Sequence, residues 1–243
     1  LNRASEQLLA QRTLLRKRDR TRTEWIAGVS HDIRTPLSLV QGNAAQLESS
    51  QELPAQARHK ARVIREQSQR IGRLVSDLNL ASKLEYELQP LHIAPFRPAA
   101  MLRAAAAEAL NHAAEEQVSV EMDIAPEAGV MSANGDEALL RRAVDNLLRN
   151  SVRHNPGQIQ LSLRLSVSEQ QWCMTVQDNG SGLPEDVLQR LRRPQENALP
   201  SHGLGLVLVQ QIVRAHGGTV CFENTQPGLK VTLSFPRLAG ENG

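Results

Sequence analysis

The sequence predicts an antiparallel helical hairpin followed by an α+β two-layer domain, and three observations lead to this fold class. Apolar residues recur every three or four positions through residues 21–89, as on one face of a helix. Three prolines, Pro90, Pro95 and Pro98, then end the helical pattern and force extended chain. Beyond them, helical stretches alternate with stretches in which every second residue is apolar, which is typical of strands packed on helices.

Two apolar stripes separated by the helix breaker Pro54 predict the hairpin. A single hairpin of this size has too little core of its own. Two hairpins pairing as a four-helix bundle would bury both stripes, so we expect a homodimer. The stripes contain Ile26, Ile33, Leu37, Val40, Ala44 and Leu47, and then Ala57, Ala61, Ile64, Ile71, Val75 and Leu78.

The second domain is expected to contain helices at 99–116, 135–153 and 204–215, with antiparallel strands between and after them. The predicted strands are "VSVEMDI", "IQLSLRLSV", "QWCMTVQD", "GTVCFEN" and "LKVTLSF". We therefore divide the chain into a connecting helix, the hairpin domain, the α+β domain and a tail, at residues 1–20, 21–89, 95–237 and 238–243.

Composition argues against several classes of partner. A hydrophobic content of 40% and a charged content of 22% are ordinary for a globular protein. The net charge of +2 gives no reason to expect nucleic acid as a partner. The basic stretch "RTLLRKRDRTR" (residues 12–22) is interpreted as a solvated helix face or connector, with contact to a membrane surface as the alternative.

The expected location is cytoplasmic. The two cysteines, Cys173 and Cys221, lie far apart in strand-like runs, which predicts reduced core thiols. No apolar run approaches the roughly 20 residues that a membrane-spanning helix needs. The chain begins at Leu rather than Met. We expect it to be the cytoplasmic portion of a longer protein, anchored to a membrane only through segments that precede it.

Three stretches of the second domain indicate a nucleotide site. In "DNLLRNSVRHN", Asn146 and Asn150 share a helix face, where carboxamide oxygens suit a divalent cation beside phosphate, and Arg153 adds positive charge. In "DNGSGLP", Asp178 can accept a hydrogen bond from an exocyclic amine. In "HGLGLVLVQQIV", a Gly-rich turn opens a helix whose backbone N–H groups can bind phosphate. Each stretch alone is a weak signal, since "DNG" is usually only a turn. Walker A and G-x-G-x-x-G patterns are absent from the sequence.

One histidine stands out by its neighbours, in "VSHDIRTPLSL". At about 100° per residue, His31 lies about 200° from Ile33 and so faces away from the apolar seam, with Thr35 about 40° from it. Asp32 can hold one ring N–H while the other nitrogen attacks phosphorus, and Pro36 is expected to bend the helix. The histidines without such neighbours are His59, His92, His112, His202 and His216; His112 with Glu115 has a spacing that also suits a metal.

The three stretches resemble the N, G1 and G2 boxes of the GHKL ATPase superfamily, and "SHDIRTPL" resembles the H box of two-component sensor histidine kinases. The resemblance implies a dimerisation and phosphotransfer hairpin and a Bergerat-fold ATP-binding domain. It implies that ATP phosphorylates His31 and that an aspartate of a response-regulator receiver domain accepts the phosphoryl group. Asp32 would act as base and orienting group, and Thr35 would position water when the receiver is dephosphorylated. Asp178 would bind adenine and Asn150 would coordinate Mg²⁺. The other implied ATP-site residues are Asn146, Arg153, His154, Gly180, Gly182, Gly203, Leu204 and Gly205.

The sequence departs from the family pattern at the lid. The stretch "LQRLRRPQENALPSH" lacks the usual F-box aromatic residue, so either Leu188 or Leu191 fills its packing role or the lid closes poorly. Ser201 stands where a glycine is common, and Trp25 where Phe is common.

Two rival functions follow. GHKL members that hydrolyse ATP typically have a glutamate base at the position of Asn146, which argues against hydrolysis as the main function. The other rival is a non-enzymatic dimeric scaffold with a degenerate nucleotide pocket.

Overall fold

The structure, a computed structural model, describes residues 2–86, 88–112, 117–155, 157–192 and 203–237. The expected tail (residues 238–243), Ser201, His202 and Glu115 lie outside these residues. The chain separates into two compact units, Leu1–Gln89 and Pro90–Gly243.

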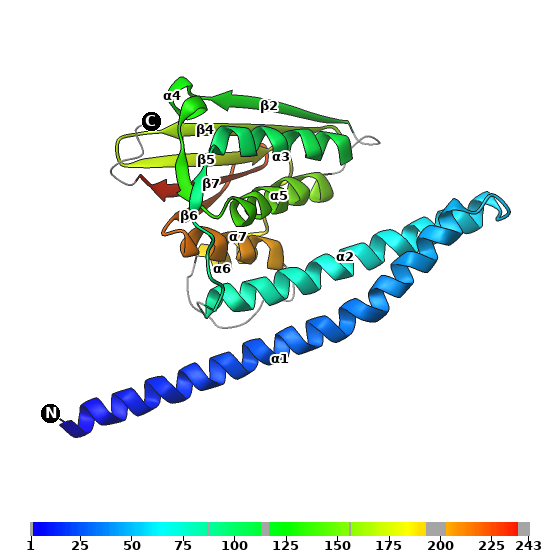
Figure 1. The fold of residues 1–243 in the computed structure, drawn as a ribbon. Coiled ribbons are helices and arrows are strands. Elements are labelled where there is room, and N and C mark those ends of the chain that lie inside the picture. Colours follow the sequence, from blue (N-terminus) through cyan, green and yellow to red (C-terminus); the bar gives the residue numbers. More distant parts are fainter. Residues whose placement is uncertain (1, 87, 113–116, 156, 193–202, 238–243) are drawn as a thin grey trace. The chain divides into compact units, whose positions relative to one another are not determined.

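The first unit is a helical hairpin formed by α1 (Asn2–Ser49) and α2 (Ala55–Glu85) (Figure 1). Helix α1 continues through Pro36. The helices approach closely at Gly72, where an added Cβ would lie 3.3 Å from the Leu37 side chain. Ile26, Ala44 and Ala61 of the predicted stripes are buried. The sequence periodicity therefore identified the helices and part of their contact face.

Charged side chains fix the register near the turn of the hairpin. The Glu48 carboxylate accepts hydrogen bonds from Arg65 Nε at 2.6 Å and Arg62 Nε at 3.3 Å. The hydrogen bond from Arg65, together with the positive charges of both arginines, lowers the pKa of Glu48 below its ordinary value. These contacts join the last turn of α1 to the second and third turns of α2.

The remaining positions of the apolar stripes are incompletely covered by one hairpin. Val40, Leu47, Ile64 and Ile71 expose between two fifths and half of their surface, with exposed fractions of 44%, 49%, 49% and 46%. Several half-exposed apolar side chains on one hairpin are unfavourable in water and are typical of an interface.

The second unit is built on a five-stranded sheet with the order β2-β4-β5-β7-β6. Helices α3, α5 and α7 pack against one face of this sheet (Figure 1). The strands are β2 (Val118–Ile124), β4 (Ile159–Val167), β5 (Gln171–Asp178), β6 (Thr219–Asn224) and β7 (Leu229–Pro236). The helices are α3 (Pro98–His112), α5 (Glu137–His154) and α7 (Leu204–Ala215).

Alternation along the strands places the core between the sheet and these helices. Leu161, Leu163 and Leu165 of β4 point inward and are fully buried, whereas the residues between them are half-buried or exposed. Leu140 and Val144 of α5 meet this surface from the helical layer. The two-layer α+β architecture predicted from the sequence is thus confirmed.

Several elements differ from the prediction. Strand β2 pairs parallel to β4, with Val118 opposite Ile159, rather than antiparallel. The connection from β2 to β4 contains helix α5. Such a crossover connection returns the chain to the end of the sheet where β2 begins, so the two strands can run parallel. The helix expected from Gly135 begins at Glu137, because Gly135 belongs to strand β3 and pairs with Ala94. The elements that were not predicted are β1 (Ala94–Phe96), β3 (Ala133–Gly135), α4 (Pro126–Val130) and α6 (Glu185–Arg192).

The expected core placement of both thiols is wrong. Cys173 is half-buried and Cys221 is exposed, and both are free cysteines. They lie on the sheet face away from the helices, where strand alternation points them.

Among the described residues, no helix combines the length and the hydropathy that crossing a membrane requires.

Candidate functional site

Asp178 lies at the end of β5 with its carboxylate held on three sides. The residue is 5% exposed. Its Oδ2 atom accepts a hydrogen bond from Ser151 Oγ at 2.8 Å. Its Oδ1 atom accepts hydrogen bonds from the backbone N–H groups of Gly180 at 2.9 Å and Leu229 at 3.2 Å. The carboxylate therefore has one orientation, and an acceptor in a fixed, desolvated position is what recognition of an exocyclic amine requires.

Two glycines make this arrangement possible. A Cβ atom at Gly180 would overlap the side chain of Asn155, and one at Gly228 would overlap the backbone carbonyl of Asp178. Gly228 also has a φ of +100°, which favours glycine. Gly180 was predicted from the sequence, whereas Gly228, Ser151 and Leu229 were not. The Pro-Gly pair before the last strand signals only a turn, so nothing in the sequence connected it with Asp178.

Helix α5 carries the two asparagines. Its N-cap is Asp136, whose side chain accepts a hydrogen bond from the N–H of Leu139 at 3.1 Å. Asn146 is 7% exposed, and its Oδ1 accepts a hydrogen bond from Arg149 Nη2 at 2.8 Å. Its Nδ2 is buried and has no hydrogen-bond partner among the residues that the structure describes. An unpaired buried amide donor costs roughly 1–3 kcal/mol, so it is typical of a site that a ligand completes.

The start of α7 lies beside Asn146. Gly203 is the N-cap of this helix and has a φ of +92°, with no side-chain cap on the first turn. A Cβ atom at Gly205 would lie 3.9 Å from Asn146 Cγ. The first backbone N–H groups of α7, including that of Leu204, lack intrahelical partners and suit phosphate oxygens.

The structure therefore brings the three predicted stretches together on α5: Ser151 meets Asp178, and Asn146 meets the start of α7. Asn150 is half-buried, Arg153 is exposed, and the side chain of His154 is outside the described residues. Gly182, with a φ of +75°, continues the turn that follows Asp178.

The donor set restricts what metal this site can hold. No three His, Cys, Asp or Glu side chains gather to hold a metal ion in the described ranges of the chain. The Asn150 carboxamide oxygen is a hard ligand that fits Mg²⁺, provided that phosphate and water supply the other oxygens. The proposed His112–Glu115 pair cannot be placed, since its side chains fall outside the described part.

The predicted lid region contains α6. Leu188 and Leu191 are both buried. Gln210 of α7 donates a hydrogen bond to the Leu191 carbonyl at 2.6 Å. Two leucines thus anchor this helix, and the rest of the expected lid, residues 193–202, lies outside the described residues.

In the hairpin unit, His31 projects from α1 into solvent. Its Nδ1 atom lies 3.4 Å from Asp32 Oδ1, and the two side chains are 77% and 84% exposed. Thr35 is exposed as well, while Ser30 is buried and donates a hydrogen bond to the Ile26 carbonyl. The contact between His31 and Asp32 is at the long end of hydrogen bonding.

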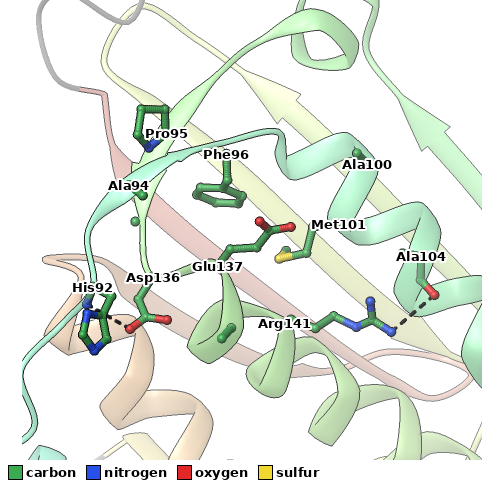
Figure 2. Close-up of a pocket in the computed structure, with 12 residues that line it drawn as sticks. His92, Ala94, Pro95, Phe96, Ala100, Met101, Ala104, Asp136, Glu137 and Arg141 are labelled. Carbon is green, nitrogen blue, oxygen red and sulfur yellow. Dashed lines mark hydrogen bonds between the residues drawn. The ribbon is translucent and has the colours of Figure 1, made fainter.

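A separate cavity of about 640 Å³ lies where β1, α3 and the start of α5 meet (Figure 2). Phe96 and Met101 form part of its apolar wall, and Asp136, Glu137 and Arg141 add charged groups. None of the predicted site residues lines this cavity.

Two family models match this chain. Residues 135–239 match the family described as "Histidine kinase-, DNA gyrase B-, and HSP90-like ATPase", and residues 21–87 match the "His Kinase A (phospho-acceptor) domain". Sensor histidine kinase YvrG of Bacillus subtilis is 31% identical over 229 residues, which are 89% of this chain and 39% of YvrG.

Two solved structures are similar. Full-length ShkA in complex with AMPPNP has a TM-score of 0.69 at 26% identity, covering 89% of this chain and 46% of ShkA. Histidine kinase ThkA in complex with the response regulator protein TrrA has a TM-score of 0.61 at 18% identity, covering 88% of this chain and 61% of the other. The chain thus spans less than two thirds of the length of these relatives.

Proposed function

Since the chain belongs to the histidine kinases, we propose that it transfers the γ-phosphoryl group of ATP to His31 and then to an aspartate in the receiver domain of a response regulator. The observation that carries the proposal is the buried, fully oriented carboxylate of Asp178 beside a helix whose buried Asn146 Nδ2 has no partner in the described part of the chain. Both features suit a purine nucleotide.

Asp178 supplies the recognition of adenine. Two backbone donors occupy Oδ1 and one hydroxyl holds Oδ2, so Oδ2 retains acceptor capacity in a fixed direction. An exocyclic amino group is a donor and fits there; a carbonyl group at the same position of the base would face an acceptor. The similar structure of ShkA in complex with AMPPNP supports an adenine nucleotide as the ligand.

The helices α5 and α7 supply the phosphate end. The uncapped first turn of α7 offers backbone N–H groups, and Asn146 offers a buried N–H beside Gly205. Asn150 is assigned to Mg²⁺, and Arg153 and His154 are assigned to the nucleotide. A bound Mg²⁺ would neutralise charge on the phosphates.

The exposure of His31 and the contact with Asp32 define the acceptor chemistry. A hydrogen on Nδ1 can be donated to the facing carboxylate, and in that tautomer Nε2 presents its lone pair to solvent. Nε2 forms a bond to the γ-phosphorus, the bond to the bridging oxygen breaks, and ADP leaves with the electron pair. Asp32 stabilises the positive charge on the ring until the Nδ1 proton is lost. The receiver carboxylate then attacks phosphorus, the N–P bond breaks with its electron pair returning to Nε2, and Nδ1 takes up a proton from water so that the ring leaves as neutral imidazole.

Hydrolysis of ATP as the main function is disfavoured. A general base for water must accept a proton, and the amide of Asn146 cannot. Its Oδ1 is moreover engaged by Arg149. Thr35, on the exposed face that carries His31, is assigned to dephosphorylation of the receiver.

The functional unit is proposed to be a homodimer. The half-exposed apolar residues Val40, Leu47, Ile64 and Ile71 lie on a single hairpin that cannot cover them. The match of residues 21–87 to the phospho-acceptor domain supports this. We assign residues 21–89 to dimerisation and phosphotransfer and 95–237 to ATP binding, in the cytoplasmic part of a longer, membrane-anchored protein. The ThkA complex with TrrA supports a receiver as the partner.

The test is incubation of the full chain with Mg²⁺ and γ-labelled ATP. Wild type should acquire a label that is labile to acid and stable to base, and His31→Gln should acquire none. His59→Gln, which changes an exposed histidine of α2, is the matched control and should retain the label. Nucleotide binding without labelling of wild type would instead support the scaffold function, and labelling of His31→Gln would assign the acceptor elsewhere.

A further inference from the structure

His216, at the end of α7, joins two helices that are far apart in the sequence. Its Nε2 atom accepts a hydrogen bond from the backbone N–H of Asp136 at 3.0 Å. Its Nδ1 atom lies 2.7 Å from the carbonyl oxygen of Ile212. A carbonyl oxygen only accepts, so Nδ1 carries the hydrogen and Nε2 the lone pair. The two contacts therefore select one tautomer of the ring, with both nitrogens used.

Asp136 is the point where three segments meet. Its side chain caps α5 through the Leu139 N–H and also accepts a hydrogen bond from the backbone N–H of His92 at 3.1 Å, which Figure 2 marks. Its backbone N–H is used by His216. The start of α5, the end of α7 and the chain entering this unit are thus tied together at a single residue.

Aromatic packing fixes the His216 ring in place. Its ring meets Phe235 edge to face, with centroids 6.4 Å apart, and Phe235 stacks on Trp172 at 4.3 Å. A Cβ atom at Gly135 would lie 3.4 Å from His216 Cδ2. The ring therefore cannot shift without moving β3 or β7.

The geometry points to His216 as a positioning residue for the nucleotide site, an inference that rests on the proposed function. Helices α5 and α7 run antiparallel, since the start of α5 meets the end of α7 while Asn146 meets Gly205. Helix α7 has twelve residues and is about 18 Å long, because each residue rises about 1.5 Å. A shift of its C-terminal end would therefore also move its N-terminal end, which lies beside Asn146. Fixing its C-terminal end against Asp136 sets where Gly203 and Gly205 present their N–H groups beside Asn146.

A pair of amide variants tests the inference in the full chain. In His216→Gln the side-chain oxygen reaches the position of Nε2 and keeps an acceptor for Asp136. In His216→Asn the amide is one methylene shorter and cannot reach. Binding of Mg²⁺ with AMPPNP is measured by calorimetry, and KM and kcat are measured for autophosphorylation.

The Gln variant should stay within about threefold of wild type, whereas Asn should raise Kd and KM about tenfold, equivalent to about 1.4 kcal/mol, with little change in kcat. Leu165→Val, a core change in β4 that lowers thermal stability away from the site, should leave Kd unchanged. A merely structural histidine would lower the active fraction and kcat while leaving Kd and KM of the folded protein intact.

The inference is overturned if Asn binds AMPPNP as wild type does, or if Gln is as weak as Asn. If wild type itself fails to bind AMPPNP, the proposed nucleotide site is wrong and this inference falls with it.

Discussion

Replacing Asp178 by Asn should change which purine the site prefers. In the structure, Oδ1 accepts two backbone N–H groups, from Gly180 and Leu229, which only an oxygen can do. In Asp178→Asn the amide oxygen must therefore occupy the Oδ1 position, and the amide nitrogen must replace Oδ2. Ser151 can turn its hydroxyl to accept from that nitrogen, so the fold is retained.

The magnitude follows from the exchange of one acceptor for a donor. With ATP, the amide nitrogen of Asp178→Asn faces the adenine amino group, so a charge-assisted hydrogen bond worth roughly 1.5–3 kcal/mol is lost. This corresponds to about 10- to 150-fold weaker binding of ATP. With inosine triphosphate, which has a carbonyl oxygen in place of the amino group, the new donor finds an acceptor, so affinity should rise relative to wild type.

The assay is competition of ATP and inosine triphosphate against a fluorescent nucleotide in the presence of Mg²⁺, for wild type and Asp178→Asn. Asp186→Asn, an exposed aspartate paired with Arg190 on α6, is the control and should leave both affinities unchanged. The thermal midpoint of each variant shows that it is folded. A variant that loses ATP without gaining inosine triphosphate would refute the assignment of Asp178 to the exocyclic amine.

Asn150→Ala should abolish labelling at millimolar Mg²⁺, because the cation loses its protein ligand; unchanged incorporation of label would exclude Asn150. Thr35→Ala should leave autophosphorylation intact and slow receiver dephosphorylation at least tenfold, as measured by loss of label from the phosphorylated receiver; if that rate persists, the assignment of Thr35 is wrong. Val40→Glu should shift the chain from dimer to monomer in sedimentation equilibrium, because it places a charge in the half-exposed apolar face. Glu48→Gln should lower the thermal midpoint at pH 7. The arginines lower the pKa of Glu48 from 4.5, so the stabilisation is complete above pH 4.5 and lost as the pH falls through the lowered pKa, where the two proteins should converge.

Sequence periodicity was sufficient for the elements that are long and amphipathic. Helices α1, α2, α5 and α7 and strands β4 and β5 each bury one face, and a repeat of 3.6 or 2 residues records which face that is. Elements of only a few residues are too short to show a periodic repeat of apolar residues. The β1–β3 pair involves three residues on each strand, including Pro95 and Gly135, and only tertiary contact holds it. Strand direction is also absent from a periodic pattern, which explains the error at β2.

The sequence predicted the site residues that lie close together along the chain, but not the contacts between residues that are far apart in the sequence. This difference has a physical reason. Asn146 and Asn150 share a helix face by spacing alone, and Asp178 and Gly180 share a turn, so sequence separation of a few residues encodes their proximity. Ser151, Leu229 and His216 contact their partners across 27, 51 and 80 residues. These residues come together only in the folded chain. The sheet order places β7 next to β5, and α5 packs antiparallel to α7.

In the proposed kinase, the residues that react with or bind ATP therefore differ from the residues that hold them in position. The groups that would touch ATP or phosphorus belong to short motifs, so the sequence names them. The groups that orient those atoms, the Ser151 hydroxyl on Asp178 and the His216 ring on Asp136, come from elsewhere in the chain. Substitutions at the first set are expected to remove the reaction. Those at the second set are expected to alter nucleotide affinity while the chemical step continues, and the comparison of His216→Gln with His216→Asn measures that difference.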